Sequence, residues 1–509
     1  MFNFTRALDR NADRWPDREA VVFEDRRLTN AALADRVNSL AAGFAELGVG
    51  RDDVVALLLY NGTEFLETTL AVNKVGGVFM PLNYRLAPPE WAYILNHAGA
   101  KAIVTEPEFV TGLEAINGDL PKLGATILVG GRGRSELGFE DLINAHAGAR
   151  IATVDRGPDD IQRLMYTSGT TSRPKGVPLS HGNVLWKIFG HIVELGLTAH
   201  DRTLMAGPMY HVGAFDLPGM GCLYVGGSLV IMRKFDAHAM MSCVQVEKPT
   251  NVWLAPAMLN AILQLPDLDR FDTGSVRFIT NGGEKMPVSI IEKVLSTFPN
   301  AWLADSYGLT ETASGDTLLD QEHTIAKLGS VGKPSAHLAI RIVRKDGSDA
   351  ASDELGEIWL KGPKVFTGYW KDADATAAAF ADGWFKTGDV GRLDDDGYLY
   401  IEDRRKDMIV SGGENIATPE IERVLYQHPA VLEAAVIGVP DARWGEVPKA
   451  FVVLRPGYST GGGDLIAYCA AELAKFKVPK TVEFTDSLPR TPSGKVLKRE
   501  LRQRANPTT

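Results

Sequence analysis

The chain has 509 residues, more than the roughly 250–300 that one hydrophobic core supports, so two or more domains are expected. Its composition is that of a globular protein, and its net charge of −10 argues against nucleic acid as the main partner. The three cysteines show no C-x-x-C spacing, which excludes a disulfide framework and a thiolate zinc site.

Neither export nor membrane insertion is expected. Residues 1–15 lack the apolar core of a signal peptide, and no run reaches the roughly 18 apolar residues of a membrane helix. Together with the cysteine spacing, this predicts a cytoplasmic protein with no transmembrane segment. The sequence leaves a homodimer open.

The first part of the chain alternates between two periodicities. Helical spacing predicts helices at 29–47, with Thr29 as the N-cap, at 64–75 and at 88–97. Short β-rich runs separate and follow these helices, at 54–60, 78–81, 102–105, 203–205, 228–232, 251–255 and 276–280. Strands that alternate with helices predict βαβ units and a parallel sheet.

The pattern changes after about residue 330. Strands at 357–360 and 398–401 surround an Asp-Gly turn at 394–397, which predicts a hairpin in a smaller β-rich region. A charged run at 403–407 is either a solvated turn or a hinge. The segment beyond it predicts a small α+β domain, with helices at 419–426 and 464–475, the second capped by Asp464, and strands at 434–439, 450–454 and 481–484.

The stretch 166–177, YTSGTTSRPKGV, combines five Ser and Thr side chains, two glycines and two cations between apolar runs. Glycine lets backbone N–H groups approach phosphate oxygens, and Ser and Thr hydroxyls add donors, so the stretch predicts a polyphosphate loop. It is not a Walker A loop, because Lys175 precedes Gly176 instead of following a glycine. A polar surface hairpin is the alternative.

Five further segments carry candidate groups. Asn281 to Glu284 follow a predicted strand, where α/β sheets place ligand loops. The others are 305–311 (DSYGLTE), 384–389 (WFKTGD), Arg404 in the charged run, and Lys495 in TPSGK near the C-terminus. Each has a plainer alternative by itself, such as a core tyrosine, a turn cap or a surface cation.

In their order and spacing, these motifs resemble the adenylate-forming (ANL) superfamily of acyl- and aryl-CoA synthetases, firefly luciferase and the adenylation domains of peptide synthetases. The resemblance covers about residues 20–501. It implies an α/β fold: a large N-terminal AMP-binding domain, 1–403, of parallel-sheet βαβ layers plus a β-rich subdomain. A small mobile α+β C-terminal domain, 404–509, would follow. In the implied reaction a carboxylate attacks the α-phosphate of ATP, and coenzyme A then displaces AMP.

The resemblance also implies the ligands of ATP. Thr167, Ser168, Gly169, Thr170, Thr171 and Lys175 would hold the β- and γ-phosphates. Tyr307 would pack on the adenine, bordered by Gly282, Gly283, Glu284, Asp305, Ser306 and Gly308. Thr310 would contact the α-phosphate, and Glu311 would bind Mg²⁺, a cation that prefers oxygen ligands. Asp389 would accept from both ribose hydroxyls, and Arg404 would donate to the ribose.

Lys495 would be the main catalytic cation and would bridge the substrate carboxylate and the α-phosphate. The other catalytic residues would be Thr310, Glu311 and His211. The small domain would swing about Lys406 between the two steps. After the swing, Gly412, Gly413, Glu414 and Trp444 would line the coenzyme A tunnel; a glycine turn and a packed tryptophan are the alternative. Ser172 stands where the superfamily usually has glycine, which puts the mobility of the phosphate loop in question.

His211 and the residues Val212, Gly213, Ala214, Ala313, Ser314 and Gly315 match the acyl pocket. His211 is interpreted as a pocket gate more than as a base. Because these residues are mostly small or apolar, the sequence favours a medium- or long-chain fatty acid. Aryl acids of the hydroxycinnamate or benzoate type stay open. An amino acid held by Asp216 is a weaker alternative.

The sequence therefore predicts an ATP-dependent acyl-CoA ligase. A stand-alone adenylating enzyme that loads a carrier protein is the second hypothesis. A nucleotide-binding regulatory protein without catalysis is the third, against which the presence of Lys175, Glu311 and Lys495 speaks.

Overall fold

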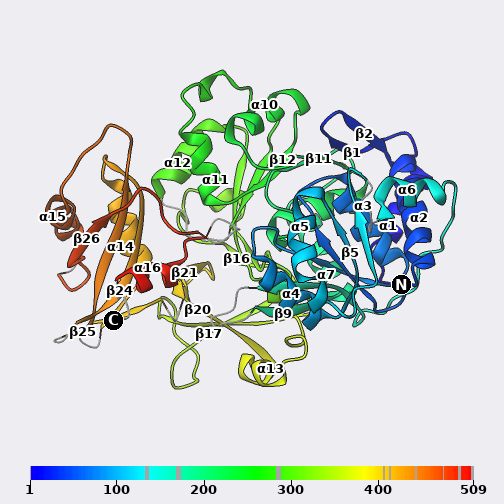
Figure 1. The fold of residues 1–509 in the computed structure, drawn as a ribbon. Helices are drawn as coiled ribbons and strands as arrows, with labels where there is room; N and C mark the ends of the chain where they lie inside the picture. The colour runs from blue at the N-terminus through cyan, green and yellow to red at the C-terminus, as the bar shows by residue number, and fades with distance from the viewer. Residues whose placement is uncertain are drawn as a thin grey trace.

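The computed structural model describes residues 2–131, 137–167, 174–282, 288–404, 407–411, 414–441, 444–473, 475–490 and 495–505. Figure 1 shows two large sheets side by side, a smaller β-rich layer below them, and a separate body formed by the end of the chain. Among the described residues, no helix combines the length and the apolar character needed to cross a membrane.

The first large sheet has seven strands within the described ranges. In spatial order they are β7 (Leu137–Gly138), β6 (Ala125–Leu128), β5 (Ala100–Thr105), β3 (Val54–Leu58), β4 (Val78–Pro81), β8 (Ile161–Thr167) and β9 (Lys175–Ser180). All neighbours are parallel except β8 and β9, which form an antiparallel hairpin. β3 reads VVALL and is buried throughout, as expected of a parallel strand covered on both faces.

The second large sheet has nine strands in the part of the chain that is described. They are β16 (Lys333–Pro334), β15 (Thr317–Leu318), β14 (Trp302–Tyr307), β13 (Phe278–Asn281), β12 (Asn251–Leu254), β10 (Arg202–Met205), β11 (Ser228–Ile231), β1 (Glu19–Phe23) and β2 (Arg26–Thr29). From β14 to β1 the neighbours are parallel, and antiparallel strands close both edges. The predicted parallel α/β architecture is therefore confirmed.

Helices connect the strands of both sheets. They are α1 (Arg6–Arg14), α2 (Asn30–Glu46), α3 (Thr63–Lys74), α4 (Pro88–Ala98), α5 (Pro107–Ile116), α6 (Phe139–Ala145), α7 (His181–Glu194), α8 (Val212–Asp216), α9 (Gly219–Val225), α10 (Ala237–Glu247), α11 (Pro256–Leu263) and α12 (Val288–Thr297), with short 3-10 turns η1 (Asn117–Asp119), η2 (Leu268–Arg270), η3 (Thr310–Thr312) and η4 (Gln321–His323). Thr29 caps α2 as predicted, because its hydroxyl accepts from Ala32 N at 3.2 Å.

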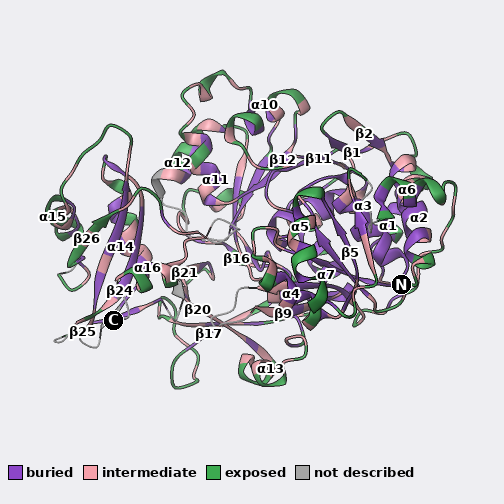
Figure 2. Cartoon of the chain, viewed as in Figure 1, coloured by how far each residue is buried: buried purple, intermediate pink, exposed green. Residues whose placement is uncertain are grey.

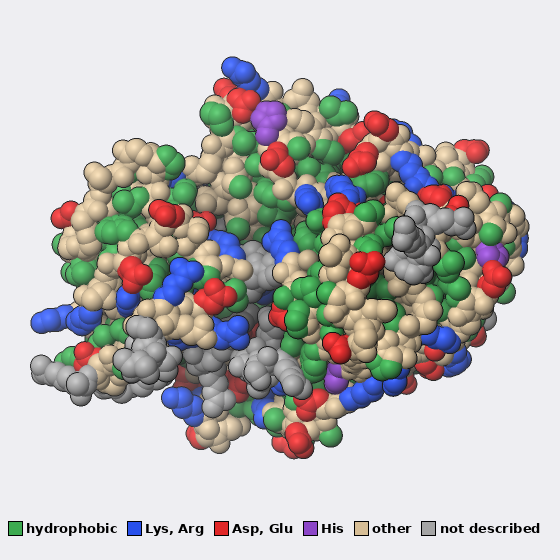
Figure 3. All heavy atoms as spheres, in the orientation of Figure 1, with side chains coloured by type: hydrophobic (Ala, Val, Ile, Leu, Met, Phe, Trp, Pro, Cys, Tyr) green, Lys and Arg blue, Asp and Glu red, His purple; other side chains and the backbone are tan. Residues whose placement is uncertain are grey.

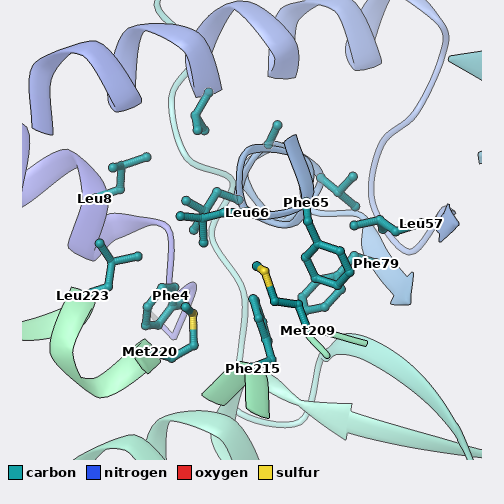
Figure 4. Close-up of a cluster of buried hydrophobic side chains, with 14 of the residues drawn as sticks. Phe4, Leu8, Leu57, Phe65, Leu66, Phe79, Met209, Phe215, Met220 and Leu223 are labelled. Carbon is teal, nitrogen blue, oxygen red and sulfur yellow. The ribbon is translucent and has the colours of Figure 1, made fainter. Parts of the chain in front are cut away.

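One hydrophobic core joins the two sheets (Figure 4). Phe215 of α8 packs against Phe65 of α3 and Phe79 of β4, with ring centroids 5.5 and 6.2 Å apart. Met209 lies in the same cluster. Figure 2 shows the sheets and their inner helices largely buried. The segment 209–215 is therefore held by aromatic packing against α3 and β4.

The β-rich layer is antiparallel. It contains β17 (Ala339–Val343), β18 (Gly356–Lys361), β20 (Trp384–Leu393), β19 (Phe380–Ala381) and β21 (Leu399–Arg404), with helix α13 (Ala373–Ala379). The predicted hairpin around 394–397 exists, but its first strand is β20 and not the 357–360 run. That run is β18, which pairs with the other edge of β20. The sequence pattern marked the turn and missed the ten-residue strand β20 because glycine and charged residues interrupt it.

The end of the chain forms a second α+β body, the C-terminal sheet with its helices. Its strands are β22 (Ile409–Ser411), β23 (Glu414–Ile416), β24 (Val431–Asp441), β25 (Gly445–Leu454) and β26 (Thr481–Phe484), and its helices are α14 (Thr418–Gln427), α15 (Gly462–Glu472) and α16 (Lys498–Ala505). The N-cap of α15 is Gly461; the predicted cap Asp464 instead accepts from Gly461 N at 3.1 Å, from the third helical position.

A crowded glycine lies beside β16, at the edge of the second large sheet. Gly332 has φ +86°, and a Cβ there would overlap the Leu318 backbone, so we expect Gly332→Ala to lower the thermal unfolding midpoint. Gly347→Ala is the matched control, because Gly347 has φ +88° and nothing near its missing Cβ. The control should lose about 2–4 °C from backbone strain, and Gly332→Ala at least twice that. Equal losses, measured by calorimetry, would contradict the packing argument.

Candidate functional site

The predicted phosphate segment belongs to the β8–β9 hairpin. Thr167 pairs with Lys175 in the antiparallel register, so these two residues bound the stretch between the strands. β9 passes directly into α7, whose start is fixed by a capping box: Ser180 Oγ accepts from Asn183 N at 3.1 Å, and Asn183 Oδ1 accepts from Ser180 N at 2.9 Å. The hairpin interpretation and the ligand-loop interpretation are therefore compatible.

Lys175 lies in a cluster that spans three parts of the chain. Its Nζ is 4.7 Å from the centroid of the Tyr369 ring, and the Tyr369 hydroxyl donates to Glu311 Oε1 at 3.0 Å. Trp370 N also donates to Gly176 O at 2.9 Å, so residues 369–370 lie along β9. Burial, together with the Glu311 charge, raises the pKa of Tyr369. The structure thus brings the predicted phosphate cation and the predicted metal ligand together.

Tyr307, predicted to pack on the adenine, and Asp389, predicted to bind the ribose, are in direct contact. The Tyr307 hydroxyl, at the end of β14, donates to Asp389 Oδ2 of β20 at 2.7 Å. Asp305 Oδ1 accepts from Asn281 Nδ2 and from Ser306 N, both at 3.0 Å. Because burial outweighs these bonds, the pKa of Asp305 rises to about 7.

Close backbone approach shapes this part of the site. A Cβ on Gly282 would lie 2.7 Å from Ser306 O, and one on Gly308 would overlap Gly315 N. These two glycines therefore let the ends of β13 and β14 and the loop after η3 pack backbone to backbone. Only glycine fits at such contacts without displacing the chain.

The loop after η3 is a run of left-handed residues. Ala313, Ser314 and Gly315 have φ values of +58°, +68° and +64°. Lys364 braces the run, since its Nζ donates to Ser314 O at 3.0 Å and to Gly315 O at 2.5 Å and lies 2.9 Å from Asp316 Oδ1. The strain is held in place by buried charge, which is typical of a functional loop.

His211 lies at the start of α8, where its Nδ1 accepts from Gly213 N at 3.2 Å. Its ring is 6.0 Å from that of Trp253. Burial, together with the charges of Lys495 and Lys187, lowers the pKa of His211 to about 3. The imidazole is therefore neutral near pH 7, and since Nδ1 accepts, its proton is on Nε2.

Lys495 therefore lies near His211, although it belongs to the C-terminal body: its charge acts on the His211 ring. Figure 1 shows the red chain before α16 running from that body toward the centre of the molecule. Figure 3 shows this face hollowed between the two bodies, with Lys and Arg side chains around the hollow. A cation-bordered hollow suits an anionic ligand.

A buried ion cluster beneath this region was not recognised from the sequence. Asp216, at the end of α8, accepts from both Arg163 guanidinium nitrogens, at 2.9 Å for Nη1, and Lys187 Nζ lies 2.9 Å from its Oδ2. All three side chains are buried. The two cations lower the pKa of Asp216. The alternative in which Asp216 holds an amino-acid ammonium is therefore wrong, because both of its oxygens are already engaged by cations.

Tyr369 was also missed, and no motif could have marked it, since its role comes from a contact with Glu311 across 58 residues. Several predicted residues lie outside the described residues, namely Ser168, Gly169, Thr170, Thr171, Ser172, Gly283, Glu284, Lys406, Gly412 and Gly413. Of Arg404 and Glu414 only the backbone is described, in β21 and β23. Trp444 lies on the connection between β24 and β25, 44% exposed.

A cavity of about 420 Å³ lies between the two bodies, lined among others by Gln264 of α11, Lys293 of α12 and Arg455. Arg455 Nη1 donates to Gln264 Oε1 across it at 3.2 Å. None of the predicted site residues lines this cavity. The candidate site is therefore the region around Lys175, Tyr307 and His211.

Comparisons with known proteins agree with this geometry. The AMP-binding enzyme family model matches residues 8–370, and the model of the AMP-binding enzyme C-terminal domain matches residues 420–495. The chain is 40% identical over 501 residues to a feruloyl-CoA synthase of Amycolatopsis sp, covering 97% of each chain. It is 36% identical over 486 residues to a long-chain-fatty-acid–CoA ligase of Mycobacterium tuberculosis, covering 95% of this chain and 94% of the relative.

Among solved structures, the anthranilate CoA ligase AuaEII in complex with anthranoyl-AMP matches with a TM-score of 0.92. Its sequence is 29% identical, and the match covers 99% of this chain and 97% of that chain. The likeness therefore extends over both bodies of the fold.

The raised pKa of Asp305 has a consequence for stability. Between about pH 4 and pH 7 the folded protein retains a proton on Asp305 that the unfolded chain loses, so stability falls as the pH rises through this window. Asp305→Asn keeps an acceptor for Asn281 Nδ2 and Ser306 N but cannot ionise. We expect its gain in unfolding midpoint over the parent to be small at pH 4 and to reach several degrees at pH 8.

Asp395→Asn, on an exposed turn, is the matched control. The difference between its unfolding midpoint and that of the parent should not change with pH. A flat profile for Asp305→Asn as well, measured by scanning fluorimetry from pH 4 to 8, would refute the buried carboxyl as the cause.

Proposed function

This chain belongs to the AMP-binding enzyme family and is an acid–thiol ligase that works through an acyl adenylate, and we propose that its acid is aromatic. ATP and coenzyme A are the other substrates. The nearness of Lys495 to His211 supports the ligase chemistry, because a C-terminal cation then lies beside the predicted acyl pocket. The feruloyl-CoA synthase relative supports the aromatic acid.

We propose that the phosphates of ATP bind at the β8–β9 hairpin, with Thr167 and Lys175 among their ligands. The pairing of Lys175 with Tyr369 and Glu311 supports this, because it gathers a cation, a hydroxyl and a carboxylate at one place. The adenosine would lie at the ends of β13 and β14, against Tyr307, with its ribose hydroxyls on Asp389.

Magnesium fits Glu311. Mg²⁺ is commonly held by one or two carboxylates together with substrate phosphate oxygens, and it does not need a cage of protein ligands. Among the described side chains, no group of three or more His, Cys, Asp or Glu residues is arranged to hold a metal. Glu311 would therefore be the protein ligand, and the ion would screen the charge of the phosphates that the hairpin holds.

In the first step a carboxylate oxygen of the acid bonds to the α-phosphorus, and the bond from that phosphorus to the pyrophosphate oxygen breaks. Two anions must approach for this, so a fixed cation lowers the barrier. We propose Lys495 as that cation and Thr310 as a donor to the same phosphate. His211 is neutral and buried, so its role would be to shape the pocket and not to transfer a proton.

In the second step the coenzyme A sulfur bonds to the acyl carbon, and AMP leaves. We propose that the chain divides at residues 403–404 and that the C-terminal body rotates about Lys406 between the steps. Gly412, Gly413, Glu414 and Trp444 would then line the path of the thiol. The hydrogen bond between Arg455 and Gln264 is compatible with a rotation, since a bond between exposed side chains is easily broken.

An aromatic acid is proposed in place of the fatty acid that the residue pattern favoured. The feruloyl-CoA synthase at 40% identity supports this, as do the His211 and Trp253 rings. The buried Lys187 and Arg163 near His211 also disfavour an alkyl chain, because an apolar tail gains nothing beside buried cations. The relative that acts on long-chain fatty acids keeps that class as the second candidate.

Pyrophosphate release, measured with a panel of acids with and without coenzyme A, tests the proposal. We expect a hydroxycinnamate to give a kcat/KM at least tenfold above decanoate and palmitate, and thioester to form when coenzyme A is present. A fatty acid as the best substrate would overturn the aromatic assignment. Acyl-AMP that forms but is not converted by coenzyme A would indicate a carrier protein as the acceptor.

Lys495→Ala should slow acyl-AMP formation roughly 10²–10³-fold, the usual loss for one preorganised donor. A charge about 4 Å from the reacting anions contributes on the order of 4 kcal/mol at an effective dielectric of 20. Thioester formation from supplied acyl-AMP should persist, because the proposed role is confined to the first step. Lys480→Ala, on the exposed surface of the same body, is the control. Equal losses in both steps would contradict the assignment.

A further inference from the structure

Two polar side chains lie one turn apart on α7 and face the protein interior. Lys187 and His191 are four residues apart, which puts them on the same side of the helix, and they are 1% and 3% exposed. His191 Nδ1 has no hydrogen-bond partner among the described residues, and its Nε2 is a long 3.4 Å from Gly315 O. Such buried polar atoms are costly unless something satisfies them.

Positive charge exceeds negative charge around Lys187. Asp216 is the one carboxylate within reach of its Nζ among the described residues, at 2.9 Å, and Arg163 already holds both Asp216 oxygens. A third cation, Lys364, also interacts electrostatically with Lys187. Lys364 is itself paired with Asp316. Burial, Arg163 and Lys364 together lower the pKa of Lys187 to about 8. Among the described residues, Arg163 and Lys187 therefore share the one carboxylate that both contact directly.

The same two side chains border the predicted acyl pocket. A Cβ on Gly315 would overlap the His191 imidazole, so the absence of a side chain at 315 lets the predicted pocket loop pack directly against His191. Lys187 affects the pKa of His211, at the start of α8, while its partner Asp216 ends the same helix. At 1.5 Å per residue, Asp216 lies about 7 Å along α8 from His211. Lys187, which contacts Asp216, therefore lies toward the end of α8 that is far from His211, and His191 lies one turn further along α7.

We propose that Lys187 and His191 determine specificity by recognising an oxygen acceptor at the far end of the acid. The inference rests on the proposed function and narrows it: the preferred substrates would be aromatic acids with a ring hydroxyl or carboxylate opposite the reacting carboxylate. The excess positive charge attracts the lone pairs of such an oxygen, and the neutral imidazole adds a hydrogen bond. An unsubstituted ring would leave both groups unsatisfied, and enzymes reject such analogues strongly.

The test compares matched acids on the full-length enzyme. Pyrophosphate release gives kcat/KM for 4-hydroxycinnamate, 4-carboxycinnamate and cinnamate, with the parent and with Lys187→Met. We expect the parent to prefer one or both substituted acids over cinnamate by roughly 10- to 100-fold, the range of a hydrogen bond to a charged group. Comparing 4-hydroxycinnamate with 4-carboxycinnamate shows whether the pocket prefers a hydroxyl or a carboxylate oxygen.

In Lys187→Met the preference should fall to within about threefold of unity. The thermal midpoint should not fall, because the variant leaves Arg163 and Asp216 as a balanced pair. His191→Leu should lower the same preference by a smaller factor, and it tests the proposal independently if the methionine variant folds poorly. Lys74→Met replaces another buried lysine, on α3 and paired with Asp9, and should leave the preference unchanged.

A parent enzyme that does not distinguish the three acids would overturn the proposal, and so would a preference that survives in Lys187→Met. Either result leaves the ligase assignment intact, since pyrophosphate release from the cinnamates still occurs. If none of these acids releases pyrophosphate while palmitate does, the aromatic assignment fails and the inference fails with it.

Discussion

The approach of Lys495 to His211 is the interaction on which the rest of the arrangement depends. It brings a turn of the C-terminal body near the N-cap of α8, as the effect of the Lys495 charge on the His211 ring shows. A cation that enters from a second body can activate an acid in one arrangement and withdraw in another. The rotation proposed above would use this, because the groups that help form the adenylate would give way to the thiol.

The elements around His211, namely α8 and the loop 313–315, are held firmly by packing. Phe215 anchors α8 between the two large sheets, and the left-handed loop 313–315 is braced by the buried Lys364–Asp316 pair. Gly308 and Gly315 pack backbone against backbone, which fixes the end of β14 beside that loop. Groups held by packed, regular elements keep the geometry that catalysis requires.

The buried charges near α8 carry a thermodynamic cost. Arg163, Lys187 and Asp216 are all removed from water, and their two cations share one carboxylate. Apolar residues of similar volume would usually be at least as stable at such positions. Departures of this kind from an apolar core are expected where function requires them, and the specificity role proposed for Lys187 gives this one a physical reason.

The sequence by itself determined the local features. The βαβ alternation, the Thr29 cap and the apolar strands that flank 166–177 follow from periodicity and side-chain chemistry over a few residues, and the order of the motifs identified the family. Only the tertiary structure paired Tyr307 with Asp389 and Tyr369 with Glu311, and enclosed Asp216 between two cations. It also showed that β20 and not 357–360 precedes the 394–397 turn. These contacts join residues far apart in the chain, and no local pattern encodes which distant side chain will compensate a buried charge or hydroxyl.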